Sequence, residues 1–119
     1  MLKKESNEFI NKLRNEFSEF TLIPEGGYHP SGAMGAGLIT QFIEQNNTHI
    51  CSAIGTATTI AGLLLSAKTD QEIIGVNVLK GGNDTNERIS FLTKDKVSSE
   101  RLTIINSYHF GGYAKHTPF

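Results

Sequence analysis

The amino-terminal segment places its apolar residues on one side of a helical period. Between residues 4 and 20, apolar side chains recur every three or four positions, and charged side chains lie between them. The apolar positions are Phe9, Ile10, Leu13, Phe17 and Phe20. This spacing predicts an amphipathic helix over residues 4–20. Residues 20–23 then form a short apolar run that ends at Pro24, which predicts a short strand.

Short apolar runs alternate with helical segments along the rest of the chain. A loop rich in glycine and proline at residues 25–32 leads into a helix that we expect to begin near Ala33 and to continue through residues 38–43. Residues 60–67 are apolar on all sides and predict a buried helix, and residues 88–92 predict an amphipathic one. Further apolar runs predict strands at residues 50–54, 73–79 and 102–105. Because connections that contain a helix favour parallel pairing, we expect an α/β fold, a layered parallel sheet flanked by helices.

Length and charge narrow the class of protein. The chain has 119 residues and a mass of 13.0 kDa, which suffices for one domain. Its formal net charge of -1 argues against nucleic acid as a main partner, because binding to phosphate backbones needs a basic excess. The single cysteine, Cys51, excludes an internal disulfide, and no apolar run approaches the roughly 20 residues that cross a bilayer. We therefore expect a protein of the reducing cytoplasm with no membrane partner.

The junction at residues 55–59 is the strongest candidate for a binding site. An apolar strand stops there and an apolar helix begins, and the residues between them are Gly55, Thr56, Ala57, Thr58 and Thr59. Backbone N–H groups at a helix start lack intrahelical partners and carry the positive end of the helix dipole, so they attract an anion such as phosphate. The threonine hydroxyls add donors, and open α/β sheets usually bind ligands at the carboxyl ends of their strands. An ordinary threonine N-cap on a core helix explains the same pattern, because the segment is neither a Walker loop nor a Gly-x-Gly-x-x-Gly motif.

Two glycine-rich segments offer a second approach to a ligand. At residues 24–27 and 32–37 the backbone could pass close over a bound molecule, because glycine has no side chain to keep it away. A flexible connection with a glycine-rich helix start accounts for both segments equally well.

The histidines, the cysteine and the aromatic residues give weaker evidence for a functional site. The four histidines have no i, i+4 pair and no nearby cysteine, so we expect no metal site. Cys51 lies within an apolar strand and is expected to be a buried, inert thiol. After the last predicted strand, residues 108–116 gather two tyrosines and two histidines around a Gly-Gly turn. This cluster fits either a ligand wall or a surface loop that its aromatic residues anchor to the body.

Four of these segments occur in the same order and at similar spacing in one enzyme family. They are residues 23–27, 32–37, 55–63 and 108–115. Together they resemble the 1-aminocyclopropane-1-carboxylate deaminase and D-cysteine desulfhydrase family of pyridoxal-phosphate enzymes, which share the tryptophan synthase β-subunit fold. The likeness spans residues 21–118. It implies that residues 1–119 are a single partial domain, the central to late part of the large cofactor-binding domain.

The resemblance also implies a chemistry and a set of site residues. The residues that would hold the phosphate of pyridoxal 5′-phosphate are Gly55, Thr56, Ala57, Thr58 and Thr59. Tyr113 would line the pocket of cofactor and substrate and act in catalysis. In such enzymes the pyridine ring is an electron sink while a bond at the α or β carbon of an amino acid breaks. The implied activity is that of a deaminase or desulfhydrase that acts on a small amino acid and releases ammonia and a 2-oxoacid, and the implied full-length enzyme is a candidate homo-oligomer.

The chain departs from the family on both sides of the shared motifs. The lysine that holds the cofactor in family members lies in an Asn-Lys-x-Arg-Lys-like stretch well before residues 24–27, and no lysine of residues 1–23 occupies that place. Family members also continue beyond Tyr113 to a second pocket tyrosine and to an acidic residue that meets the pyridine nitrogen. We therefore expect a fragment that is catalytically inactive alone. The alternative is a non-catalytic phosphate-binding or structural α/β module.

Overall fold

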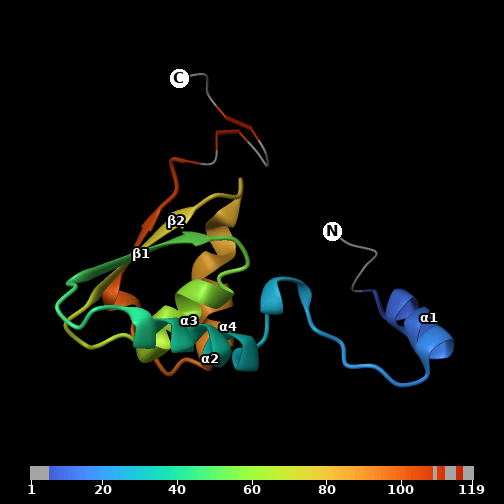
Figure 1. Cartoon of the computed structure of the whole chain (residues 1–119). Coiled ribbons are helices and arrows are strands. Elements are labelled where there is room, and N and C mark those ends of the chain that lie inside the picture. Colours follow the sequence, from blue (N-terminus) through green and yellow to red (C-terminus); the bar gives the residue numbers. More distant parts are fainter. Residues whose placement is uncertain (1–5, 109, 112–114, 117–119) are drawn as a thin grey trace.

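A parallel sheet lies at the centre of the structure, a computed structural model that describes residues 6–108, 110–111 and 115–116 (Figure 1). Its strands are β1 (His49–Ile54), β2 (Glu72–Asn77) and β3 (Leu102–Ile105), which pair in that order and in parallel. Each connection between neighbouring strands contains a helix, either α3 (Thr58–Ser66) or α4 (Thr85–Thr93). The predicted α/β class and the parallel pairing are thus confirmed.

The helices cover one face of this sheet. α3 packs on β1 and β2, and α2 (Pro30–Gly37) and α4 pack against α3. The largest fully buried side chains lie between these layers and are Ile54, Ile60, Leu64, Ile73 and Leu92. α3 is apolar around its circumference because the sheet and two helices surround it, so the prediction of a buried helix is confirmed. Within the described ranges, no helix combines the length and the apolarity that a bilayer crossing requires.

The helix that we expected near Ala33 begins three residues earlier, at Pro30. The ring nitrogen Nδ1 of His29 accepts a hydrogen bond from the N–H of Ser31 at 3.2 Å and caps the first turn. Proline suits the position after the cap, because its missing N–H would have no intrahelical partner there. A 3-10 helix, η3 (Leu38–Phe42), continues the chain.

Residues 32–37 therefore lie inside a helix and not in a loop that passes over a ligand. α2 and α3 approach each other so closely that a Cβ on Gly62 would contact the carbonyl oxygen of Ala33 and lie 2.6 Å from the backbone nitrogen of Gly37. The glycines at this crossing serve helix packing.

The predicted strand at residues 20–23 is wrong. These residues pair with no strand of the described chain, and the side chain of Ile23 is 77% exposed. A strand needs a neighbour for its hydrogen bonds, and a short apolar run does not specify one. The segment instead joins α1 (Asn7–Phe17) to a short 3-10 turn, η2 (Glu25–Gly27).

α1 confirms the predicted amphipathic helix, and each of its ends lies three residues inside the predicted range. The hydroxyl of Ser6 accepts a hydrogen bond from the N–H of Phe9 at 3.2 Å and caps its first turn. None of its residues is buried, and the helix stands apart from the sheet and its helices (Figure 1).

Within the described residues, no helix packs on the second face of the sheet. Because side chains alternate along a strand, β1 directs Ile50 and Ile54 toward the helices and Cys51 and Ala53 toward the opposite face. Cys51 is exposed, so the expectation of a buried thiol is wrong. A run of apolar residues does not reveal whether one or both faces of its strand are covered, and here the helical layer covers only one.

Arg101 forms hydrogen bonds with backbone carbonyl groups at and after the carboxyl end of α3. Its guanidinium donates hydrogen bonds to the carbonyl oxygens of Leu64 at 3.2 Å, Gln71 at 3.1 Å and Lys68. The last carbonyls of a helix lack intrahelical partners, and a hydrogen bond from a charged donor contributes about 1.5–3 kcal/mol.

We expect Arg101→Ala to lower the free energy of unfolding by about 2 kcal/mol in urea denaturation. Arg14→Ala, which removes the same charge from the exposed surface of α1, should change it by less than about 0.5 kcal/mol. Equal effects of the two substitutions would contradict this role.

Candidate functional site

The carboxyl end of β1 leads directly into the amino end of α3. Gly55 and Thr56 follow the strand, and Ala57 precedes the first residue of the helix. Ala57 adopts a left-handed conformation, with φ 71° and ψ 0°, although it is not glycine and is only 2% exposed. Such a conformation costs on the order of 1–3 kcal/mol and persists only where the surroundings hold it in place. The packing at this junction thus maintains a strained turn.

The first turn of α3 has no side-chain cap within the described chain. Among the described residues, α4 likewise has no side-chain cap, whereas the first turns of α1 and α2 are capped by Ser6 and His29. A left-handed residue followed by a right-handed one turns successive N–H groups toward one concavity, an arrangement that suits anions. The amino end of α3 therefore presents backbone donors at the positive end of a helix dipole.

Two of the three threonine hydroxyls at this junction have partners within the protein. Thr56 Oγ1 donates to the carbonyl oxygen of Gly26 at 3.3 Å and lies 3.0 Å from Thr58 Oγ1. Thr58 is only 6% exposed, whereas Thr59 is exposed. The hydroxyls of Thr56 and Thr58 thus stabilise the turn. The exposed Thr59 side chain takes no part in these hydrogen bonds.

The structure brings residues 24–27 to the same place. The hydrogen bond from Thr56 to Gly26 joins residues 30 positions apart in the chain. Gly26 and Gly27 both have positive φ, 64° and 63°, and a Cβ on Gly26 would collide with the Thr56 side chain. A Cβ on Gly55, in contrast, would meet no atom within 4 Å. One side of the junction is therefore closed by the glycine turn, and the space beside Gly55 is open.

Asn77 organises the neighbouring strand end, and sequence reasoning missed it. This residue ends β2, is 3% exposed, and lies opposite Ile54 in the sheet register. Its side-chain amide donates to the carbonyl oxygen of Gly82 at 3.2 Å, to Thr85 Oγ1 at 3.0 Å and to Asn106 Oδ1 at 3.0 Å. The loops after β2 and β3 are thus tied together at the edge where β1 ends. A polar amide at the end of an apolar strand, before a Gly-Gly turn, is the signal that could have identified it.

The aromatic cluster after β3 is described only in part. Tyr108 and Phe110 are exposed, and their rings form an edge-on pair with centroids 6.3 Å apart. Tyr113, which the family resemblance places in the cofactor and substrate pocket, lies outside the described residues. Among the residues that are described, no group of three or more His, Cys, Asp or Glu side chains could hold a metal ion.

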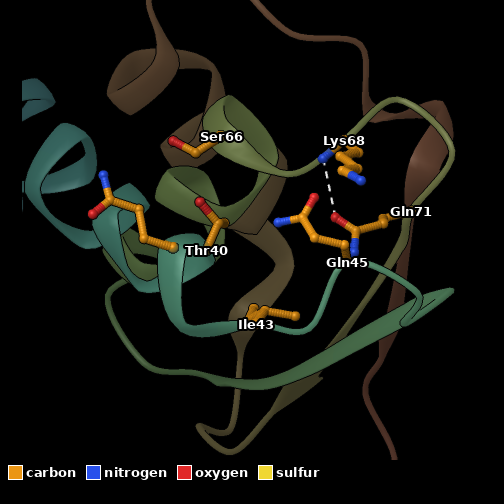
Figure 2. A pocket seen from close by; sticks show the side chains of 7 residues that line it. Thr40, Ile43, Gln45, Ser66, Lys68 and Gln71 are labelled. Carbon is orange, nitrogen blue, oxygen red and sulfur yellow. Dashed lines mark hydrogen bonds between the residues drawn. The ribbon is translucent and has the colours of Figure 1, made fainter.

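Two of the cavities that the described residues form lie away from the junction. One of about 270 Å³ is lined largely by polar side chains near the carboxyl end of α3 (Figure 2). Gln71 in its wall accepts a hydrogen bond from the N–H of Lys68 at 3.0 Å and donates one to the carbonyl oxygen of Asn47 at 2.9 Å, so its amide serves the loops. A second cavity of about 280 Å³ lies beside Met34 and Lys94. Because Gln71 directly precedes β2, the first cavity lies at the amino edge of the sheet, opposite the edge where α/β sheets usually bind ligands.

Comparison with models of known protein families found no match, and comparison with curated proteins found none either.

Proposed function

We propose that residues 55–59 bind the phosphate of pyridoxal 5′-phosphate, as part of an enzyme with the tryptophan synthase β-subunit fold. The activity proposed is that of a deaminase or desulfhydrase for a small amino acid of the 1-aminocyclopropane-1-carboxylate or D-cysteine type, which releases ammonia and a 2-oxoacid. The order and spacing of the four motifs support the family. The observation that carries the binding site is the uncapped first turn of α3 at the carboxyl end of a parallel strand.

The residues present fit a phosphate group through the backbone. The N–H groups of Thr58 and Thr59 would donate to the phosphate, and the open space beside Gly55 would admit it. The hydroxyls of Thr56 and Thr58 would act indirectly, because they hold the turn in its left-handed conformation. When bound, the cofactor supplies an electron sink for bond breaking in an amino acid. Turnover also needs a lysine that holds the cofactor, and the resemblance gives none of this chain's lysines that role, so the effect expected of this chain is binding.

Pyridoxal 5′-phosphate is expected to raise the melting temperature of the protein, whereas pyridoxal is not. A ligand at 100 times its Kd adds about 2.7 kcal/mol of stability, and in a small domain each kcal/mol corresponds to roughly 4–8 °C. Pyridoxal has the same aldehyde but no phosphate, so it controls for reaction with surface lysines. Thermal melting followed by circular dichroism measures both shifts. Equal protection by the two compounds would contradict a phosphate site.

Thr59→Asp is expected to abolish this shift while the chain still folds. A carboxylate in the first turn of a helix stabilises the helix by about 0.3–1 kcal/mol, but it repels a phosphate at the same place. Asn86→Asp is the matched control, because Asn86 is exposed and holds the same second position in α4. A shift that survives Thr59→Asp would contradict the assigned residues. The absence of any shift in the unmodified protein would contradict the proposed function and favour a structural α/β module.

A further inference from the structure

The sheet face opposite the helices is apolar and uncovered. Its side chains form two rows across the strands, Cys51, Ile74 and Thr103 in one and Ala53, Val76 and Ile105 in the next. Cys51 and Ala53 are exposed, and the apolar side chains of β2 and β3 in these rows are only half-buried. We call these six residues the open face. Parallel sheets occur almost exclusively with both faces covered, so the open face requires an occupant.

Among the described residues, the apolar side of α1 is not buried against any other element. α1 has 11 residues, none of them buried, and Phe17 on its apolar stripe is 56% exposed. Isolated helices shorter than about 12–15 residues are marginal in water, so α1 gains stability only if the apolar stripe packs against another surface. An amphipathic helix is also the kind of element that covers a parallel sheet.

The connection between α1 and the body has the form of an arm. Residues 19–24 run without helix or strand, and Leu22 and Ile23 project exposed from them. In Figure 1 this segment leads α1 away from the sheet and its helices. A helix at the end of an extended arm is placed to reach a neighbouring molecule.

We propose that α1 of one copy of this chain packs across the open face of a second copy, and that the two copies exchange these helices. Each copy has one helix without a partner and one open face, so exchange about a two-fold axis satisfies both copies and closes the assembly. Phe9 is 38% exposed and Phe17 is 56% exposed, so both have apolar surface left to bury, and each enters the contact twice per dimer. A stable complex typically buries roughly 1,200–2,000 Å², to which two helices and two open faces would contribute here. This inference does not depend on cofactor binding.

The first test is the mass of the protein in solution. Light scattering is expected to give twice the 13.0 kDa of one chain. Phe9→Asp should convert the dimer to a monomer, because it puts a charge into the apolar stripe while an acidic residue in the first turn still favours the helix. Asn7→Asp adds the same charge to the same turn away from the stripe and should leave the dimer intact. A monomer at high micromolar concentration in the unmodified protein would overturn the proposal.

The second test uses the native thiol of the open face. In the variant Leu13→Cys, diamide should oxidise the introduced thiol and Cys51 to a disulfide, taking up the two electrons and the two thiol protons. Non-reducing electrophoresis is expected to show covalent dimers, and mass spectrometry should identify a bond between positions 13 and 51. Asn15→Cys, whose thiol would lie on the polar side of α1, is the control that should not form this bond.

Two further outcomes would overturn the proposed exchange. A disulfide between positions 13 and 51 within a single monomer would mean that α1 folds back onto its own sheet, and it would overturn the exchange. Rapid alkylation of Cys51 at all protein concentrations would mean that no copy of α1 covers the open face, and it would equally overturn the proposal.

Discussion

Gly62→Ala is expected to lower the free energy of unfolding by about 2 kcal/mol or more, or to prevent folding. Besides its contact with the carbonyl oxygen of Ala33, a Cβ at this position would lie 2.6 Å from the nitrogen of Gly37 and 2.8 Å from the Cβ of Ala36. Backbone atoms cannot move away by a change of rotamer, so α2 and α3 must separate. Overpacking costs about 1–3 kcal/mol and occasionally more, and the gain of roughly 1 kcal/mol in helix propensity offsets only part of that cost. Urea denaturation followed by circular dichroism measures the change.

Gly35→Ala is the matched control for the helix crossing. Gly35 also lies within a helix, α2, but a Cβ there would meet no atom within 4 Å. We expect this variant to be as stable as the unmodified protein or more stable by up to about 1 kcal/mol, because alanine favours helix over glycine. If both substitutions stabilised the protein, the close approach of α2 and α3 would be refuted.

The strands and the central helix could be predicted from the chain because they are short apolar runs between turns and a segment that is apolar on all sides. β1, β2 and β3 are short apolar runs separated by polar turns, and α3 is apolar on every side. Such runs must be buried, and only a layered arrangement buries a helix between a sheet and other helices. The predicted strand after Phe20 failed because the same local pattern has no neighbouring strand to pair with.

Local pattern placed the start of α2 three residues too late, and it could not identify the open face. A segment with three glycines between residues 32 and 37 has low helix propensity, yet it is helical because Gly62 lets it pack closely on α3. Likewise, the exposure of Cys51 depends on which face of the sheet the helices cover, and this is a property of the tertiary fold.

The candidate site could also be predicted from the sequence only in part. Sequence reasoning singled out both residues 24–27 and residues 55–59, and the hydrogen bond between Thr56 and Gly26 places them side by side. It did not foresee that the Thr56 and Thr58 hydroxyls lie within hydrogen-bonding distance of each other, because that depends on the left-handed turn at Ala57. Side-chain roles at a turn follow from its backbone conformation, which the residue types alone do not determine.

Asn77→Asp is expected to lower the free energy of unfolding by about 3–5 kcal/mol at pH 7. The substitution replaces a buried donor with a carboxylate that faces the carbonyl oxygen of Gly82, Asn106 Oδ1 and the Thr85 hydroxyl, which itself donates to Gly82. A buried charge without a compensating partner carries a cost of this size. Chemical denaturation measures the loss, and the loops after β2 and β3 should separate first.

The loss at position 77 should depend on pH in a defined direction. Burial beside acceptor oxygens raises the pKa of the introduced carboxyl above the value of about 3.9 in the unfolded chain, because only the protonated form can donate a hydrogen bond. The free energy of unfolding of Asn77→Asp should therefore be highest below about pH 4 and fall as the pH rises toward the raised pKa, by up to about 1.4 kcal/mol per pH unit. Asn83→Asp puts the same charge on an exposed position of the same loop and should show no such fall. Parallel pH profiles of the two variants would contradict the buried amide network at the end of β2.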